Sequence, residues 1–276
     1  MSEAELLLGI VVATALAFDF TNGFHDTANA VATSISTRAL RPRAAVGLAA
    51  LLNFAGAFIS LEVAATVASD VVDAGVITQQ VVFAGLVGAI TWNLITWYFG
   101  LPSSSSHALI GGVVGSAFAA VGADAVLGDG VLGKVLIPAL VAPIVAFSVA
   151  GISIVIVYRI VGRQRPGIVS RGYRLGQVVS ASMFALAHGT NDAQKTMGII
   201  VLALIAHGSL PAEGFDVPVW VIVSAAAAIG LGTYTGGWRI IRTLGRRISD
   251  IQPAQGFAAE TASSAIILSA AHLGFA

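Results

Sequence analysis

The sequence predicts an all-α polytopic membrane protein, and three observations support this fold class. Hydrophobic residues make up 57% of the chain, charged residues only 10%, and the mean hydropathy is +0.89, whereas a soluble domain carries about 25% charged residues. Several apolar stretches reach the roughly 20 residues that a membrane crossing needs. These stretches show no period-two alternation, which favours helices over barrel strands. They cover residues 44–69, 79–100, 135–158, 218–238 and, more briefly, 257–271.

The distribution of charge predicts the topology. Twelve of the fourteen basic residues fall in three loops, at 38–43, 159–174 and 239–247, and acidic residues occupy the alternate loops, at 70–73, 124–129 and 213–216. The positive-inside rule then places the basic loops in the cytoplasm and the N-terminus outside, in a multi-pass cell-membrane protein. In this count the chain turns near Leu101, where residues 100–103 form either a cytoplasmic loop or a re-entrant tip within the membrane.

Two polar segments suggest an internal repeat. Residues 18–29 (FDFTNGFHDTAN) align without gaps on residues 184–195 (FALAHGTNDAQK), and Phe, Gly and Asp are shared at an offset of 166. The charge topology makes the two copies run in opposite directions through the membrane. Polar, Gly-bearing breaks at corresponding positions of inverted halves indicate a substrate site at the midplane. We therefore expect an inverted-repeat transporter with broken or re-entrant helices.

The repeat predicts a division of the chain into three parts. The first inverted repeat covers residues 1–160, a basic cytoplasmic linker covers residues 161–175, and a second, incomplete repeat covers residues 176–276.

The polar segments carry candidate cation ligands. Asp26 and Asn29 share one helix face and offer carboxylate and amide oxygens to a hard cation such as sodium; Asn191 and Asp192 offer the same from the other half. The alternative is a hydrogen-bonded pair that joins two helices. Lys195 stands at the position of Asn29, where it neutralises Asp192, replaces a second cation or attracts an anion; the sequence does not decide among these roles.

A serine-rich turn carries candidate anion donors. Ser103, Ser104, Ser105 and Ser106 follow Pro102 at a predicted helix start, where unpaired backbone N–H groups point outward. Their hydroxyl groups add further donors to a predicted anion site. The alternative is a polar surface turn with serine caps. Because cation ligands and anion donors occur together, the sequence favours cotransport of an anion with cations.

Other polar residues are weaker candidates. Glu260 begins the last apolar run and is either a buried or an interfacial acid. Asp19 is interpreted as a snorkelling or capping residue, with a place in the site as the alternative. The histidines in the polar segments are expected to form hydrogen bonds in their neutral state, since no pair shows the spacing of a zinc site. The chain has no cysteine, so neither disulfides nor thiolate sites are predicted. We also expect no cofactor and no catalytic residue, and we do not expect the protein to be an enzyme.

Three segments resemble the inorganic phosphate transporter family: residues 23–33 (GFHDTANAVAT), 102–107 (PSSSSH) and 187–195 (AHGTNDAQK). The resemblance implies a secondary active symporter that imports inorganic phosphate with sodium or protons by alternating access, commonly as a homodimer in the lipid bilayer. No nucleic-acid partner is expected. On this resemblance Asp26, Asn29, Asn191 and Asp192 hold the coupling cation, and Ser103 to Ser106 with Thr27 hold phosphate. Asn22, His25, Lys195 and Glu260 are further candidates.

The chain departs from the family pattern at one point, and two other functions compete with phosphate transport. The family has a second Ser/Thr-rich turn, expected after residues 271–276, so we expect the chain to be part of a longer transporter. A sulfate permease of the same fold is the nearest rival. An intramembrane serine hydrolase that uses Ser104 with His107 is a remote one, because a serine and a histidine this close at a helix start seldom face one another for attack.

Overall fold

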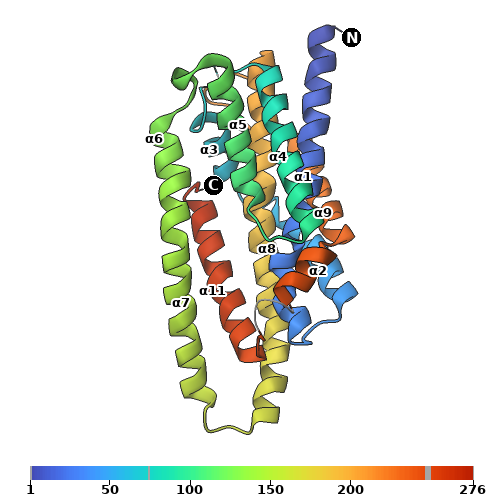
Figure 1. Ribbon diagram of the computed structural model, residues 1–276, viewed down its shortest axis with the longest axis vertical. Helices are drawn as coiled ribbons and strands as arrows, with labels where there is room; N and C mark the ends of the chain where they lie inside the picture. The colour runs from blue at the N-terminus through green and yellow to red at the C-terminus, as the bar shows by residue number, and fades with distance from the viewer. Residues whose placement is uncertain (1, 74, 246–249, 276) are drawn as a thin grey trace.

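The computed structural model describes residues 2–73, 75–245 and 250–275, and within these ranges the chain is helical with no β-strand. Its longest helices, α1 and α8, run side by side in opposite directions at the centre (Figure 1). The helices are α1 (Glu3–Ser36), α2 (Pro42–Gly56), α3 (Glu62–Ser69), α4 (Gln79–Phe99), α5 (Ser105–Val121), α6 (Gly128–Gly130), α7 (Ile137–Val161), α8 (Pro166–His207), α9 (Val219–Thr235), α10 (Trp238–Thr243) and α11 (Pro253–His272), with short helices η1 (Ala123–Ala125) and η2 (Val131–Leu136).

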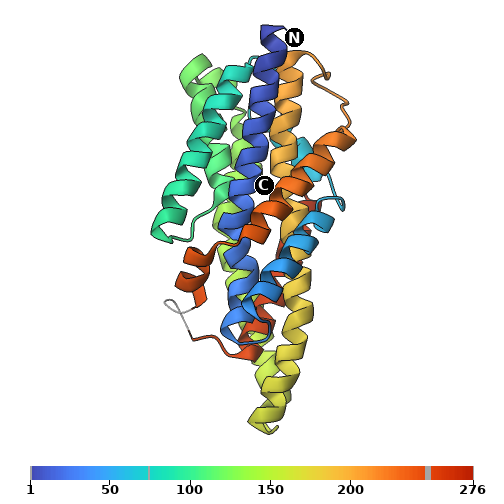
Figure 2. The ribbon, with the colours of Figure 1, turned by 90° about the vertical axis from the view of Figure 1, so that its right-hand side faces the viewer.

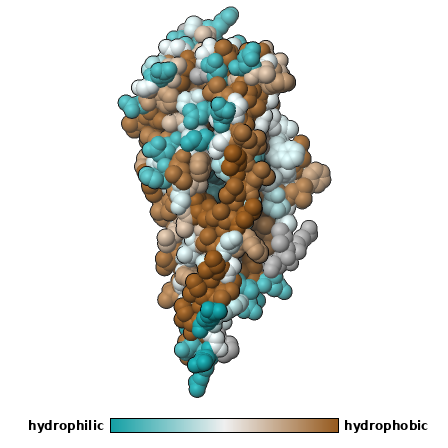
Figure 3. All heavy atoms as spheres, turned by 90° about the vertical axis from the view of Figure 1, so that its left-hand side faces the viewer, coloured by the Kyte–Doolittle hydropathy of each residue, from teal (hydrophilic) through white to brown (hydrophobic). Residues whose placement is uncertain are grey.

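Three helical stretches are long and apolar enough to cross a membrane: Glu3–Ser36, Gln79–Phe99 and Gly128–Val161. The last of these contains α7, whose apolar side chains are largely exposed; Phe147, for example, is 83% exposed. Figure 3 shows this face of the molecule, with apolar residues along its middle and hydrophilic residues toward its ends. A helix that is apolar all round and not covered by protein is suited to a lipid environment.

The neutral turn near Leu101 is a re-entrant tip. Helix α4 ends at Gly100, which has a left-handed φ of 67°, and α5 begins at Ser105. Between them the chain reaches the middle of α1, since Ser103 lies against His25 and Ser105 against Asn22. The two helices form a hairpin whose open ends point to one end of the molecule (Figure 1). The chain returns to the side where it started whether α4 and α5 form a re-entrant hairpin or two full crossings. The predicted side of each charged loop is therefore unchanged.

Two further helices are interrupted. The α2–α3 pair is broken at residues 57–61, and the α9–α10 pair is broken at Gly236 and Gly237. The expected breaks at the two polar segments are absent, because α1 and α8 continue as unbroken helices through residues 18–29 and 184–195. Helix breaks therefore occur in both halves, but in α2–α3 and α9–α10 and not in the helices α1 and α8 that carry the two polar segments.

The aligned glycines explain how the halves pack together. A Cβ on Gly23 of α1 would lie 2.5 Å from the Ile229 carbonyl oxygen of α9, and a Cβ on Gly189 of α8 would lie 2.2 Å from the Asn53 carbonyl oxygen of α2. Each motif helix thus approaches the backbone of a broken helix from the other half. Small residues permit such close helix contacts in membranes. The two crossings are related as an inverted repeat requires.

Charged loops gather at opposite ends of the molecule. The α1–α2 and α7–α8 connections lie toward one end, and the α8–α9 and α3–α4 connections lie toward the other (Figure 2). Of the predicted basic loop at 239–247, Arg246 and Arg247 lie outside the described residues. Residues 166–175 of the predicted linker form the first turns of α8. The division into repeats stays a prediction.

Candidate functional site

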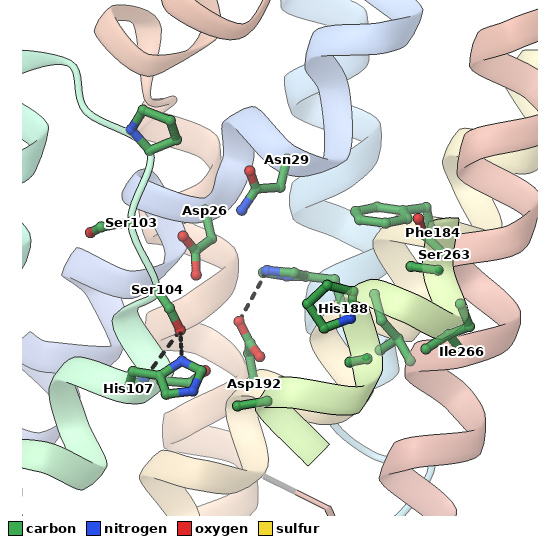
Figure 4. Close-up of a pocket in the computed structure, with 17 residues that line it drawn as sticks. Asp26, Asn29, Ser103, Ser104, His107, Phe184, His188, Asp192, Ser263 and Ile266 are labelled. Atoms are coloured by element: carbon green, nitrogen blue, oxygen red, sulfur yellow. Dashed lines mark hydrogen bonds and ion pairs between the residues drawn. The ribbon is translucent and has the colours of Figure 1, made fainter. Parts of the chain in front are cut away.

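Asp26 of α1 and Asp192 of α8 converge at the centre of the bundle. Oxygen atoms of the two carboxylates and a ring nitrogen of His188 all lie within 4.8 Å of one another, and all three residues are buried. Figure 4 shows the two carboxylates pointing toward each other. Such a cluster has the donor types of a cation site.

The Asp26 carboxylate is held by an imidazole from its own helix and a hydroxyl group from the hairpin. His25 Nδ1 lies 2.9 Å from Asp26 Oδ1, and the Ser105 hydroxyl contacts Asp26 Oδ2. The same hydroxyl lies 2.7 Å from the amide oxygen of Asn22. Asn22, His25 and Ser105 therefore position Asp26 and fasten the re-entrant tip to α1.

The Asp192 carboxylate is held by an internal cation. Lys195 Nζ lies 2.7 Å from Asp192 Oδ1, and His188 Nε2 lies 3.0 Å from Asp192 Oδ2. The ammonium also donates to Ser106 Oγ at 2.7 Å. Of the three roles open to Lys195, neutralisation of Asp192 is therefore present in the structure, and the same ammonium reaches the serine-rich tip.

A cavity of about 700 Å³ opens beside these carboxylates. Its walls come from α1, the hairpin tip, α7, α8 and α11. Apolar side chains such as Pro143, Phe184 and Ile267 form much of the wall. The polar lining residues are Asp26, Asn29, Ser103, Ser104, Ser106, His107, His188, Asp192 and Ser263.

The remaining predicted site residues are distributed around this cavity. Asn29 is exposed to it, whereas Asn191 lines a smaller neighbouring cavity and its amide donates to the Phe275 carbonyl oxygen at 3.4 Å. Ser105 is buried beneath the tip rather than on the cavity wall. The three other serines of the turn line the cavity, although the hydroxyl group of Ser103 donates to Thr96 Oγ1 at 3.1 Å and points away from Asp26 (Figure 4).

Two predicted residues lie elsewhere. Thr27 is fully buried, and its hydroxyl donates to the Gly23 carbonyl oxygen at 2.5 Å, on the side of α1 that packs against α9. We therefore leave Thr27 out of the anion site. Glu260 is buried, not interfacial, in a separate polar cluster where Ser180 donates to it at 2.5 Å and Thr33 also contacts it.

The structure also corrects the reading of two other side chains. His188 belongs to the central cluster, although only its i,i+4 spacing to Asp192 could have indicated this from the sequence. Asp19 is neither a cap nor a snorkelling residue, because it lies in the middle of α1 with 0% exposure.

The expectation that Ser104 and His107 do not face one another is wrong. Ser104 Oγ lies 2.7 Å from His107 Nδ1 and also accepts the His107 backbone N–H at 3.1 Å, so this serine is the N-cap of α5 (Figure 4). Among the described residues no acid is bonded to His107. A triad needs a third group that orients the base, so the geometry is that of a helix cap.

Comparison with known proteins adds three findings. The model of the phosphate transporter family matches residues 22–171 and 163–276. Two relatives, each called a probable low-affinity inorganic phosphate transporter, come from Mycobacterium bovis (57% identical, 100% of this chain and 66% of that protein) and Rhizobium meliloti (49% identical, 98% and 80%). The chain thus spans 66% of the length of the first relative.

The third finding concerns the fold. A solved structure titled "The sodium-dependent phosphate transporter" superposes with a TM-score of 0.89 over 98% of this chain and 85% of that one, at 19% identity. This confirms the all-α, inverted-repeat architecture with re-entrant and broken helices.

Proposed function

This chain belongs to the phosphate transporter family, and on that premise we propose that it moves inorganic phosphate across the membrane together with a coupling cation. The observation that carries the proposal is the convergence of Asp26 and Asp192, from oppositely directed helices, on one cavity that the serine-rich tip also lines. Charged residues inside a membrane are expensive, at about 2.5 to 3.5 kcal/mol each. Their pairing at one point therefore favours a function over a purely structural role.

The anion side of the site is formed by the hairpin tip. Ser103, Ser104 and Ser106 line the cavity at the N-terminus of the 17-residue helix α5. Lys195 lies against Ser106 and adds positive charge behind this surface. Hydroxyl donors, a helix N-terminus and an ammonium group together suit a tetrahedral oxyanion.

The cation side is formed by the first half. Asp26 and Asn29 both line the cavity, and neither has a bond to Lys or Arg among the described residues. A cation bound there would neutralise Asp26 and reduce the cost of bringing a doubly charged anion into the bilayer. We propose sodium or a proton as the coupling ion at Asp26 and Asn29, whereas the predicted ligand Asp192 is paired with Lys195 and Asn191 lines the neighbouring cavity.

The fold supports alternating access as the mechanism. The site lies where the two inverted halves meet, and rocking of one half against the other would expose it to each side in turn. We place the basic loops in the cytoplasm and the N-terminus outside, in line with the positive-inside rule. A homodimer in the cell membrane, with no cofactor and no catalytic residue, completes the proposal.

Reconstitution in liposomes tests the function. The chain should take up radiolabelled phosphate when a sodium or pH gradient is imposed, and collapse of the gradient should stop accumulation. The full-length relative from Mycobacterium bovis serves as the control for vesicle quality. Absence of uptake by this chain, with uptake by the relative, would contradict the proposal for this chain.

Competition with sulfate tests which anion the site prefers. Hydrogen phosphate keeps an O–H donor that sulfate lacks, so an acceptor such as Asp26 or Asp192 would discriminate between them. Excess sulfate should leave phosphate uptake unchanged. Inhibition by sulfate, with uptake of labelled sulfate, would assign the chain to sulfate transport.

A further inference from the structure

Asp19 is a buried acid outside the central cavity, and it has no role in the proposal above. Asp19 lies seven residues before Asp26 on α1, with Asn22 between them on the same face of the helix. Its exposure is 0%, and among the described residues neither of its carboxylate oxygens has a hydrogen-bond partner. The hydroxyl oxygen of Thr196 on α8, which is beside this carboxylate, has no partner either.

The charged surroundings do not supply a counter-ion. Of the helices packed against α1, α8 brings the two charged side chains that act on Asp19, namely Asp192 and Lys195. These two are bonded to each other at 2.7 Å, and no ion pair joins Lys195 to Asp19. The buried Glu260 of α11 and His25 of α1 have their own partners, at Ser180 and Thr96 respectively. Asp19 thus has one like charge and one occupied ammonium near it.

Glu260 is a buried carboxyl group with a different set of neighbours. The carboxylate of Glu260 is surrounded by donors from three residues: Thr33, Gln177 and Ser180. Such donors are what an ionised carboxylate needs when it is taken out of water. Asp19 has the Thr196 hydroxyl and the Asn22 side chain beside it, but neither of its oxygens is hydrogen-bonded among the described residues, so an ionised Asp19 would be less well compensated for its burial than an ionised Glu260.

We infer that Asp19 binds the coupling proton of the proposed phosphate transport, as a neutral carboxylic acid whose O–H group donates to Thr196 Oγ or to the Asn22 amide oxygen. A proton suits the place better than a metal cation. Hard cations require a shell of several oxygen ligands, and here the unpartnered oxygens are the two of Asp19 and that of Thr196. The coupling role of this proton rests on the proposed function, whereas the presence of the proton on Asp19 does not.

A hydrogen-bonded path runs from Asn22, which lies beside this acid, to the central site. The Asn22 amide oxygen accepts the Ser105 hydroxyl at 2.7 Å, and the same hydroxyl contacts Asp26. The Ser105 hydroxyl has one proton to donate, so an Asp19 O–H that takes its place on the Asn22 oxygen leaves the Ser105 proton for Asp26. Protonation of Asp19 would therefore strengthen the support of Asp26 and of the hairpin tip.

Infrared spectroscopy on the protein in lipid vesicles tests the proton without relying on transport. The wild type should show the C=O stretching band of a protonated carboxylic acid near neutral pH, and Asp19→Asn should lack it. Glu260→Gln is the matched control, because it removes another buried acid and should keep the band. Asp19→Asn should also melt like the wild type, since the amide is isosteric with a neutral acid. A wild type without the band, or a band that sodium abolishes, would overturn the inference.

A transport measurement tests the coupling. In the wild type a pH gradient should raise phosphate accumulation; Asp19→Asn should lose that response, and Asp19→Glu, which keeps the acid, should restore much of it. An unchanged pH response in Asp19→Asn would overturn the coupling role. If the wild type moves no phosphate at all, the proposed function fails, while the infrared band still decides whether Asp19 holds a proton.

Discussion

The two aligned motifs place an aspartate at the same point but satisfy it differently. Asp26 is held by an imidazole and a hydroxyl group, whereas Asp192 is held by the ammonium of Lys195. The first half therefore offers oxygen ligands whose charge is not compensated by Lys or Arg, and the second half contains a cation fixed to the chain. The difference teaches that an inverted repeat need not give two equal ion sites, because a single change from Asn to Lys replaces an exchangeable cation by a permanent one.

Removal of the permanent cation should have the largest effect. Lys195→Met leaves Asp192 buried and without its ammonium partner, and breaking a buried pair in this way costs about 3 to 5 kcal/mol of stability. The free energy of unfolding in mixed micelles would measure it. The double variant Asp192→Asn/Lys195→Met should recover most of the loss, since no uncompensated charge remains. Equal stability of Lys195→Met and the wild type would mean that the pair is not a structural element.

A substitution at Asp26, in the proposed site of the exchangeable cation, should affect transport rather than stability. Asp26→Asn keeps the shape of the side chain but provides no charge for a cation, so gradient-driven phosphate accumulation should fall roughly a hundredfold, equivalent to about 2.7 kcal/mol. The exposed Asp129 provides the control, because Asp129→Asn makes the same chemical change at the surface. Accumulation by Asp26→Asn at the wild-type level would remove the cation role of the first half.

The glycine crossings test whether the halves pack as equivalents. Gly23→Ala and Gly189→Ala both force a Cβ into backbone atoms, and such overpacking costs about 1 to 3 kcal/mol. Gly189→Ala should be the worse, since its Cβ would lie 2.2 Å and 2.4 Å from Asn53 atoms, against 2.5 Å and 2.8 Å at Gly23. Gly47→Ala in α2, where no atom lies within 4 Å, should not destabilise. A cost at Gly47 equal to that at Gly189 would show a general intolerance of alanine.

Much of this arrangement could be predicted from the sequence, and the missing parts have a physical reason. The apolar runs, the alternating charge of the loops and the Gly23–Gly189 offset are local patterns, so they give the fold class and the inversion. Thr27 and Asp19 could not be placed in this way. Both lie on a helix that is buried on several sides, so the sequence does not tell which neighbouring helix each side chain meets.

The serine turn shows the same limit at shorter range. The sequence indicated its donors, but the choice between a surface loop and a re-entrant tip depends on contacts with α1, 78 to 83 residues away in the chain. Likewise Ser105 and Ser106 are neighbours in the chain, yet one bonds to Asp26 and the other to Lys195. Helix geometry directs adjacent residues to different sides, and only the packing of the two halves decides what each side meets.

The prediction with the smallest expected effect concerns a variant whose second motif has the same ligand pattern as the first. Lys195→Asn removes the ammonium and restores an amide oxygen three residues after Asp192, the pattern of Asp26 and Asn29. Asp192 would then need a cation from solution, so sodium should stabilise this variant, by about 1.4 kcal/mol when its concentration is ten times the Kd. Thermal unfolding at constant ionic strength, with sodium replaced by choline, would measure the effect. Lys195→Met is the matched control, because it removes the same charge but supplies no oxygen ligand and should gain less from sodium. An equal sodium effect in both variants would show that the Asn oxygen is not a ligand, and the analogy between the two halves would then end at the aspartates.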